Sequence, residues 1–130
     1  MFKKYNDTPA AIAIGVLTIF SIIQTVSFAF TAETFLEDAG IGLAALPMAY
    51  WLCGLFAALT VGLILTFIKG PDGQSIFFNV VLVVQIGSVI GNLIEYATDA
   101  ATKSPPALLA LFIVVAALYC FGYFRLRSRL

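Results

Sequence analysis

The sequence predicts an all-α membrane protein, a four-helix antiparallel transmembrane bundle with both termini cytoplasmic. Of its 130 residues, 62% are hydrophobic and 11% are charged, whereas a soluble domain is roughly 45–50% apolar and about 25% charged. The apolar residues gather in four runs, and each run has the ~17–25 residues that a membrane-spanning helix needs. We therefore expect a single transmembrane domain over residues 1–130.

Helix start and stop signals flank the four runs. Asp7 or Thr8 can cap the first helix, and Pro9 suits its first turn, where the missing N–H leaves no bond unmade. Gly70 can adopt the left-handed conformation that ends a helix, and Pro71 cannot continue one. These signals predict spans at about 9–30, 44–68, 76–97 and 106–124.

Basic residues lie mostly on one side of the predicted membrane. Lys103 alone falls on the other side, and the cytoplasmic side of a membrane protein is the one rich in lysine and arginine. Short loops and this asymmetry predict a bacterial inner (cytoplasmic) membrane. The residues of the cytoplasmic side are Lys3, Lys4, Lys69, Arg125, Arg127 and Arg129.

The partners that these charges allow are limited. The basic tail at 125–129 is expected to anchor the orientation, or alternatively to bind anionic membrane lipids. The formal net charge is zero, and the basic residues are too scattered for a phosphate-tracking surface, so no nucleic acid is expected to bind.

A polar stripe runs along the third predicted span. Its members recur at spacings of three and four, which places them within one arc of roughly 80° on a helix. Gly87 and Gly91 lie beside the stripe at the small-xxx-small spacing of helix contacts. The members are Gln85, Ser88, Asn92, Glu95 and Asp99.

The first span carries a matching polar face. Thr18, Ser21 and Thr25 share one stripe, and Gln24 lies at its edge. Polar groups that face lipid are unfavourable. We therefore expect the polar faces of the first and third spans to face each other inside the bundle.

Two interpretations of this polar face are open. In the first, the polar side chains hydrogen-bond across helices and only hold the bundle together. In the second, they line a water-filled vestibule in which Glu95 binds a cation or proton, with Asn92, Ser88 and Gln85 along the route.

An acidic rim is predicted on the outer side. The first helix is expected to extend outside to about residue 39, because its apolar and acidic positions keep to separate helical faces. Glu33, Glu37 and Asp38 would lie there, near Glu95 and Asp99. Carboxylates suit calcium, but the spacing matches no calcium loop, and without histidine nothing indicates zinc. No metal site is predicted.

Motifs of catalysis are missing from the sequence. It has no histidine to bind haem, no phosphate-cradling glycine loop and no Gly-x-Ser-x-Gly. Cys53 and Cys120 fall at different depths and are expected to remain free thiols. We predict no catalytic residue and no cofactor.

The first half of the chain resembles the DoxX-like group of small four-helix membrane proteins. The resemblance rests on a long first helix, the segment Phe35-Leu36-Glu37-Asp38-Ala39-Gly40-Ile41, and a second helix with Tyr50-Trp51-Leu52-Cys53-Gly54 followed by Val61-Gly62-Leu63. It implies an association with respiratory and redox membrane complexes, and it assigns no functional residue.

These observations favour a non-catalytic accessory or assembly subunit of a larger membrane protein complex. Its partners would be membrane lipids and other membrane subunits, or copies of itself. A small oligomeric transporter or channel for a cation or small polar solute, using the polar stripe, is the alternative. An enzyme acting on a lipid or quinone, with Glu95 as acid or base, is a third possibility.

Overall fold

Four long helices make up most of the protein. The computed structural model describes residues 4–38, 40, 42–98 and 106–130, and within them there is no strand. Each of the four long helices is long and apolar enough to cross a membrane. The predicted all-α four-helix bundle is confirmed, and the chain is an integral membrane protein. The helices are α1 (Thr8–Asp38), α2 (Leu46–Lys69), α3 (Ser75–Ala97) and α4 (Pro106–Leu126), with a short 3-10 helix η2 (Leu43–Ala45) before α2.

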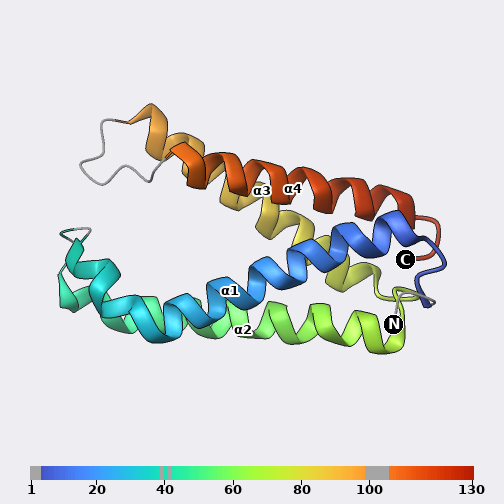
Figure 1. Cartoon of the computed structure of the whole chain (residues 1–130), viewed down its shortest axis with the longest axis horizontal. Coiled ribbons are helices and arrows are strands. Elements are labelled where there is room, and N and C mark those ends of the chain that lie inside the picture. The colour runs from blue at the N-terminus through green and yellow to red at the C-terminus, as the bar shows by residue number, and fades with distance from the viewer. Residues whose placement is uncertain (1–3, 39, 41, 99–105) are drawn as a thin grey trace.

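The helices run alternately up and down, so that both chain ends and the α2–α3 turn meet at one end of the bundle (Figure 1). We call this the terminal end. The helices that pack along each other are α1 with α2, α1 with α4, and α3 with α4. The α1–α2 and α3–α4 pairs come together at the terminal end and separate toward the opposite end (Figure 1).

The helix boundaries follow from local chemistry. The backbone N–H of Ala10 donates to Oδ1 of Asp7 at 2.9 Å, so Asp7 caps α1. Pro47 lies in the first turn of α2, where a proline leaves no hydrogen bond unmade. Gly70 ends α2 with a φ of 98°, which a residue with a side chain rarely adopts, and its N–H donates to the carbonyl of Thr66 at 2.8 Å.

The first helix is longer than a bilayer core requires. Its 31 residues extend about 46 Å at 1.5 Å per residue, against a core of about 30 Å. Near its end, Ala32 and Leu36 pack against Ala49 of α2 in a small cluster. The helix ends at Asp38, and residue 39, where the predicted extension ended, lies outside the described residues.

The main core lies toward the terminal end. Its largest fully buried side chains come from every helix and from the segment before α1. Tyr5 precedes α1, Ile14 and Leu63 belong to α1 and α2, and Phe78 and Tyr119 belong to α3 and α4. All four helices are therefore joined through one packed cluster.

Candidate functional site in the membrane-spanning core

A ladder of hydroxyl groups joins α1 to α2. The hydroxyls of Ser21 and Thr60 lie 2.7 Å apart, and those of Thr25 and Thr60 lie 3.2 Å apart. The thiol of Cys53 faces the carbonyl of Thr25 at 3.6 Å. The sequence does not single out Thr60, because the other threonine of the second span, Thr66, falls on a different helical face and the two form no stripe. Two residues of the polar face predicted for the first span thus hydrogen-bond with α2.

A small polar cavity lies where the four helices meet. Its volume is about 20 Å³, which is room for about one water-sized group. Ser21 and Gln24 of α1 line it together with Gln85 and Ser88 of α3. The remaining walls are apolar and include Phe112 of α4. The cavity is where the structure brings residues of the two predicted stripes together.

Gln85 is the most deeply placed polar residue of the α3 stripe. It is 8% exposed, and among the described residues none hydrogen-bonds with its amide. No fully enclosed polar atom lacks a partner within the described parts of the chain, so the amide keeps accessible surface on the cavity it lines. Its donors and acceptor are therefore available to a molecule in the cavity.

Beyond Gln85, polar side chains of the stripe hydrogen-bond with backbone carbonyls of α3 itself. The hydroxyl of Ser88 donates to the carbonyl of Val84 at 2.9 Å, and the amide of Asn92 donates to the carbonyl of Ser88 at 2.7 Å. Glu95 is half-buried and has an interaction partner, and Asp99 lies outside the described residues. Asn92 and Glu95 are not among the residues that line the polar cavity. A transport route along the whole stripe stays a prediction.

The remaining predicted residues lie apart from the cavity. The hydroxyl of Thr18 is buried and donates to the carbonyl of Ile14 in its own helix at 2.8 Å. Glu33, Glu37 and Asp38 are exposed on the last turns of α1. In the described parts of the chain, no three histidine, cysteine or acidic side chains cluster as metal ligands would.

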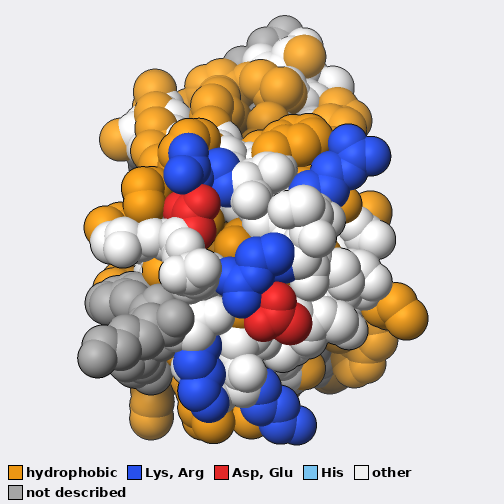
Figure 2. All heavy atoms as spheres, turned by 90° about the vertical axis from the view of Figure 1, so that its right-hand side faces the viewer, with side chains coloured by type: hydrophobic (Ala, Val, Ile, Leu, Met, Phe, Trp, Pro, Cys, Tyr) orange, Lys and Arg blue, Asp and Glu red, His pale blue; other side chains and the backbone are white. Residues whose placement is uncertain are grey.

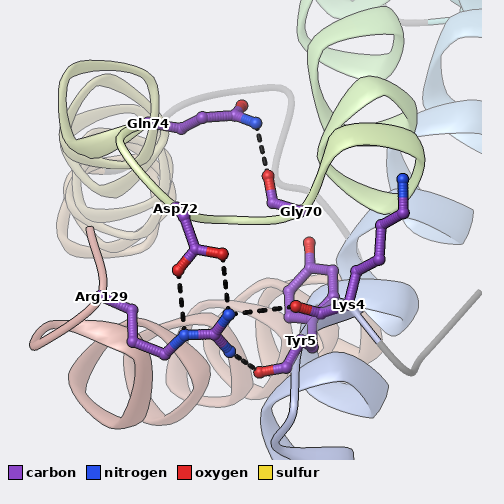
Figure 3. Close-up of polar contacts among 6 residues, drawn as sticks. All are labelled: Lys4, Tyr5, Gly70, Asp72, Gln74 and Arg129. Carbon is purple, nitrogen blue, oxygen red and sulfur yellow. Dashed lines mark hydrogen bonds and ion pairs between the residues drawn. The ribbon is translucent and has the colours of Figure 1, made fainter.

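Arg129 ties three segments together at the terminal end (Figure 3). Its guanidinium forms a bidentate ion pair with Asp72 of the α2–α3 turn, at 3.0 and 2.8 Å. The same group donates to the backbone carbonyls of Tyr5 and, at 3.1 Å, of Lys4. The carboxyl end of the chain thereby holds both the amino end and the α2–α3 turn. We call these four residues the terminal lock.

Further polar contacts surround the terminal lock. Arg125 pairs with Asp7 at 2.9 Å, and basic side chains with acidic ones between them spread over this end of the molecule (Figure 2). The Ala10 N–H and the Arg125 guanidinium lower the pKa of Asp7. The buried hydroxyl of Tyr5 lies 2.5 Å from that of Thr66; burial raises the pKa of Tyr5, and this hydrogen bond opposes the rise.

Comparison with protein-family models, with curated proteins and with solved structures found no match to this chain. The resemblance to the DoxX-like group stays a prediction, and the functional argument rests on the geometry of the bundle.

Proposed function

We propose that the protein is a non-catalytic accessory or assembly subunit of a larger membrane protein complex. The observation that carries the proposal is an open face on α3. Gly87 and Gly91 are exposed there, and a methyl group added at either would meet no atom within 4 Å. A small-xxx-small pair allows two helix backbones to approach closely. Within the described residues, no helix of this chain uses that pair.

The surroundings of Gly87 and Gly91 support the same proposal. Of the residues in the α3 span, 17% are buried inside the bundle, against 33% in the α1 span, although the two spans have similar hydropathy. Val83 and Ile94, one turn to either side of the pair, are 69% and 58% exposed. In lipid, helices associate through packing rather than through the hydrophobic effect. An exposed face with small residues at its centre is therefore a suitable place for a partner helix.

The first experiment is extraction of the protein from its native membrane in a mild, lipid-retaining medium, followed by measurement of the particle's mass and composition. We expect other polypeptides to come with it in a fixed ratio. A monodisperse monomer, or a homo-oligomer without other polypeptides, would contradict the proposal.

A pair of variants tests whether the α3 face carries the association. Gly87→Leu places a large side chain at the centre of the face and is expected to release most of the associated polypeptides. Ala117→Leu is the matched control, because Ala117 is exposed on α4. Equal retention of partners by both variants would show that the α3 face is not the contact.

We also propose that the protein lies in a bacterial inner membrane with its terminal end in the cytoplasm. The described basic residues of the predicted cytoplasmic side, such as Lys69 and Arg125, lie at or beyond the helix ends that meet there. Ser128→Cys provides a test with a membrane-impermeant thiol reagent, and Cys53→Ser and Cys120→Ser remove the native thiols. Labelling is expected only after the cells are opened. Labelling of intact cells to the same extent would reverse the orientation.

A further inference from the structure

An apolar groove lies between α2 and α3. Its volume is about 520 Å³, within the range of roughly 300–1,000 Å³ that is usual for small-molecule sites. Of the described residues that line it, Ser88 alone is polar. The apolar walls are Leu52, Leu55, Phe56, Ala58 and Leu59 from α2, and Phe77, Val80 and Val84 from α3.

The groove is continuous with the polar cavity. Four residues line both spaces: Phe56, Leu59, Val84 and Ser88. Beyond them lies Gln85, a residue that is 8% exposed and whose side-chain amide, among the described residues, has no hydrogen-bond partner. Ser21 bonds with Thr60 and Ser88 donates to Val84, whereas Gln24, the other polar residue of the cavity, is only half-buried. A large apolar space therefore ends at one buried amide with free hydrogen-bonding capacity.

We propose that the groove and the polar cavity together bind an uncharged, membrane-soluble molecule that carries one hydroxyl or carbonyl group. The apolar body of this molecule lies in the groove between α2 and α3. Its single polar group enters the cavity and hydrogen-bonds with the amide of Gln85. The volume of the cavity, about 20 Å³, accommodates one such group.

The depth of Gln85 excludes a charged headgroup as the ligand. Gln85 lies about 15 Å along α3 from Ser75, at 1.5 Å per residue, and this is near the middle of a hydrocarbon core of about 30 Å. Charged lipid headgroups stay at the membrane surface, because moving a charge to this depth is unfavourable. Among the described residues, no charged side chain lines either space. The ligand is therefore a neutral molecule dissolved among the lipid tails.

One end of the groove is closed by the ring of Phe77, which reaches from α3 to Gly62 of α2. A methyl group added at Gly62 of α2 would overlap the ring of Phe77. The missing side chain at Gly62 lets this ring lie directly against the α2 backbone. Phe77 is also a wall of the groove. The closure lies toward the α2–α3 turn, so the apolar body of the ligand extends from Gln85 along the groove without passing this end.

The test uses the purified full chain in lipid nanodiscs, so its failure would leave the subunit proposal untouched. Two photoreactive probes are compared: a long-chain primary alcohol with a diazirine next to its hydroxyl-bearing carbon, and the matching alkane without the hydroxyl. Labelled residues are mapped by mass spectrometry. We expect the alcohol to label the walls shared by the groove and the cavity, such as Phe56 and Val84, more strongly than the alkane does.

Gln85→Leu removes the hydrogen bond and is expected to lower labelling by the alcohol about three- to tenfold, which is the factor that one hydrogen bond contributes. Labelling by the alkane should not change. Asn79→Leu is the control, because it removes an amide from an exposed position on the same helix.

Ala58→Phe fills the groove without disturbing a buried position, since Ala58 is exposed where it lines the groove. It should abolish labelling of the groove walls by both probes, whereas Ala117→Phe on α4 should preserve it. The proposal is overturned if the alcohol labels the wild-type protein and Gln85→Leu equally, because the cavity would then hold water only. It is also overturned if Ala58→Phe leaves the labelling pattern unchanged.

Discussion

The two ends of the bundle are held by different kinds of contact. At the terminal end, charged and polar groups from distant parts of the chain meet beside the main apolar core, as Arg129 does with Asp72 and with the carbonyl of Tyr5. At the opposite end of the α1–α2 pair, the described contacts are a small apolar cluster of Ala32, Leu36 and Ala49. The helix pairs stay together where the terminal lock lies and separate away from it (Figure 1).

The difference indicates that one end of the bundle holds the helices together, while the rest leaves surfaces open for binding. Arginine bonds to backbone carbonyls and to a carboxylate are directional and stronger than neutral hydrogen bonds. Together with the main apolar core, which lies toward the same end, they hold the two helix pairs there, and the pairs do not need to pack along their whole length. The pairs can then leave a groove and the open face of α3 within the membrane, where other molecules can bind.

The largest effect is expected from breaking the terminal lock. Arg129→Ala removes the bidentate ion pair with Asp72 and two bonds to backbone carbonyls. We expect the free energy of unfolding in detergent to fall by about 1.5–3 kcal/mol, mainly through the bonds to the carbonyls, because the pair with exposed Asp72 is screened. Circular dichroism during chemical denaturation measures this loss. Arg127→Ala is the control, since Arg127 is exposed, and an equal loss in both variants would show that the lock does not stabilise the bundle.

A comparison of two glycines sharpens the contrast between closed and open regions. A methyl group at Gly122 of α4 would lie 3.2 Å from Cδ1 of Ile14 and 3.3 Å from Cβ of Ala13. Gly122→Leu should therefore push α1 and α4 apart and lower the free energy of unfolding by about 1–3 kcal/mol. Gly87→Leu adds the same bulk on the open face and should leave the isolated chain at least as stable as the wild type. If both substitutions destabilise the isolated chain equally, the α3 face is not open.

The smallest effect is expected from the charge of Asp7. Because its pKa is lower in the folded protein than in the unfolded chain, the stability it contributes is present above the unfolded pKa of about 3.9 and is lost as the pH falls through the folded value. Asp7→Asn keeps a good helix cap but removes the titration. The wild type should lose thermal stability on acidification below about pH 4, and the variant should lose less. Parallel melting-temperature curves for the two proteins would contradict this assignment.

Local features of the bundle could be predicted from particular residues. The four apolar runs predict four helices, because backbone groups in lipid must be satisfied within a helix. Asp7 and Gly70 predict two of the boundaries, since capping and left-handed backbone depend only on neighbouring residues. The 3.6-residue period also predicts that the polar residues of α3 share one face of the helix. Two of these residues, Gln85 and Ser88, line the cavity.

Which residues contact each other across helices could not be predicted from the sequence. The hydroxyl of Ser21 bonds with Thr60, which belongs to no stripe, and Arg129 meets Asp72 across 57 residues of sequence. Gly87 and Gly91 have the spacing of a helix contact, yet no described helix of the chain packs on them. None of these contacts can be predicted from the pattern of neighbouring residues in the sequence.

The sequence by itself therefore determined the number of long helices, most of their ends and the polar faces of α1 and α3. Only the tertiary structure decided how the helices are rotated and which pairs pack, and so where the groove and the buried amide of Gln85 lie. The physical reason is the solvent. In water an apolar face must turn inward, but lipid tails are as apolar as a leucine side chain. The apolar pattern of a membrane helix thus leaves its rotation undetermined, and shape and a few distant polar contacts select it.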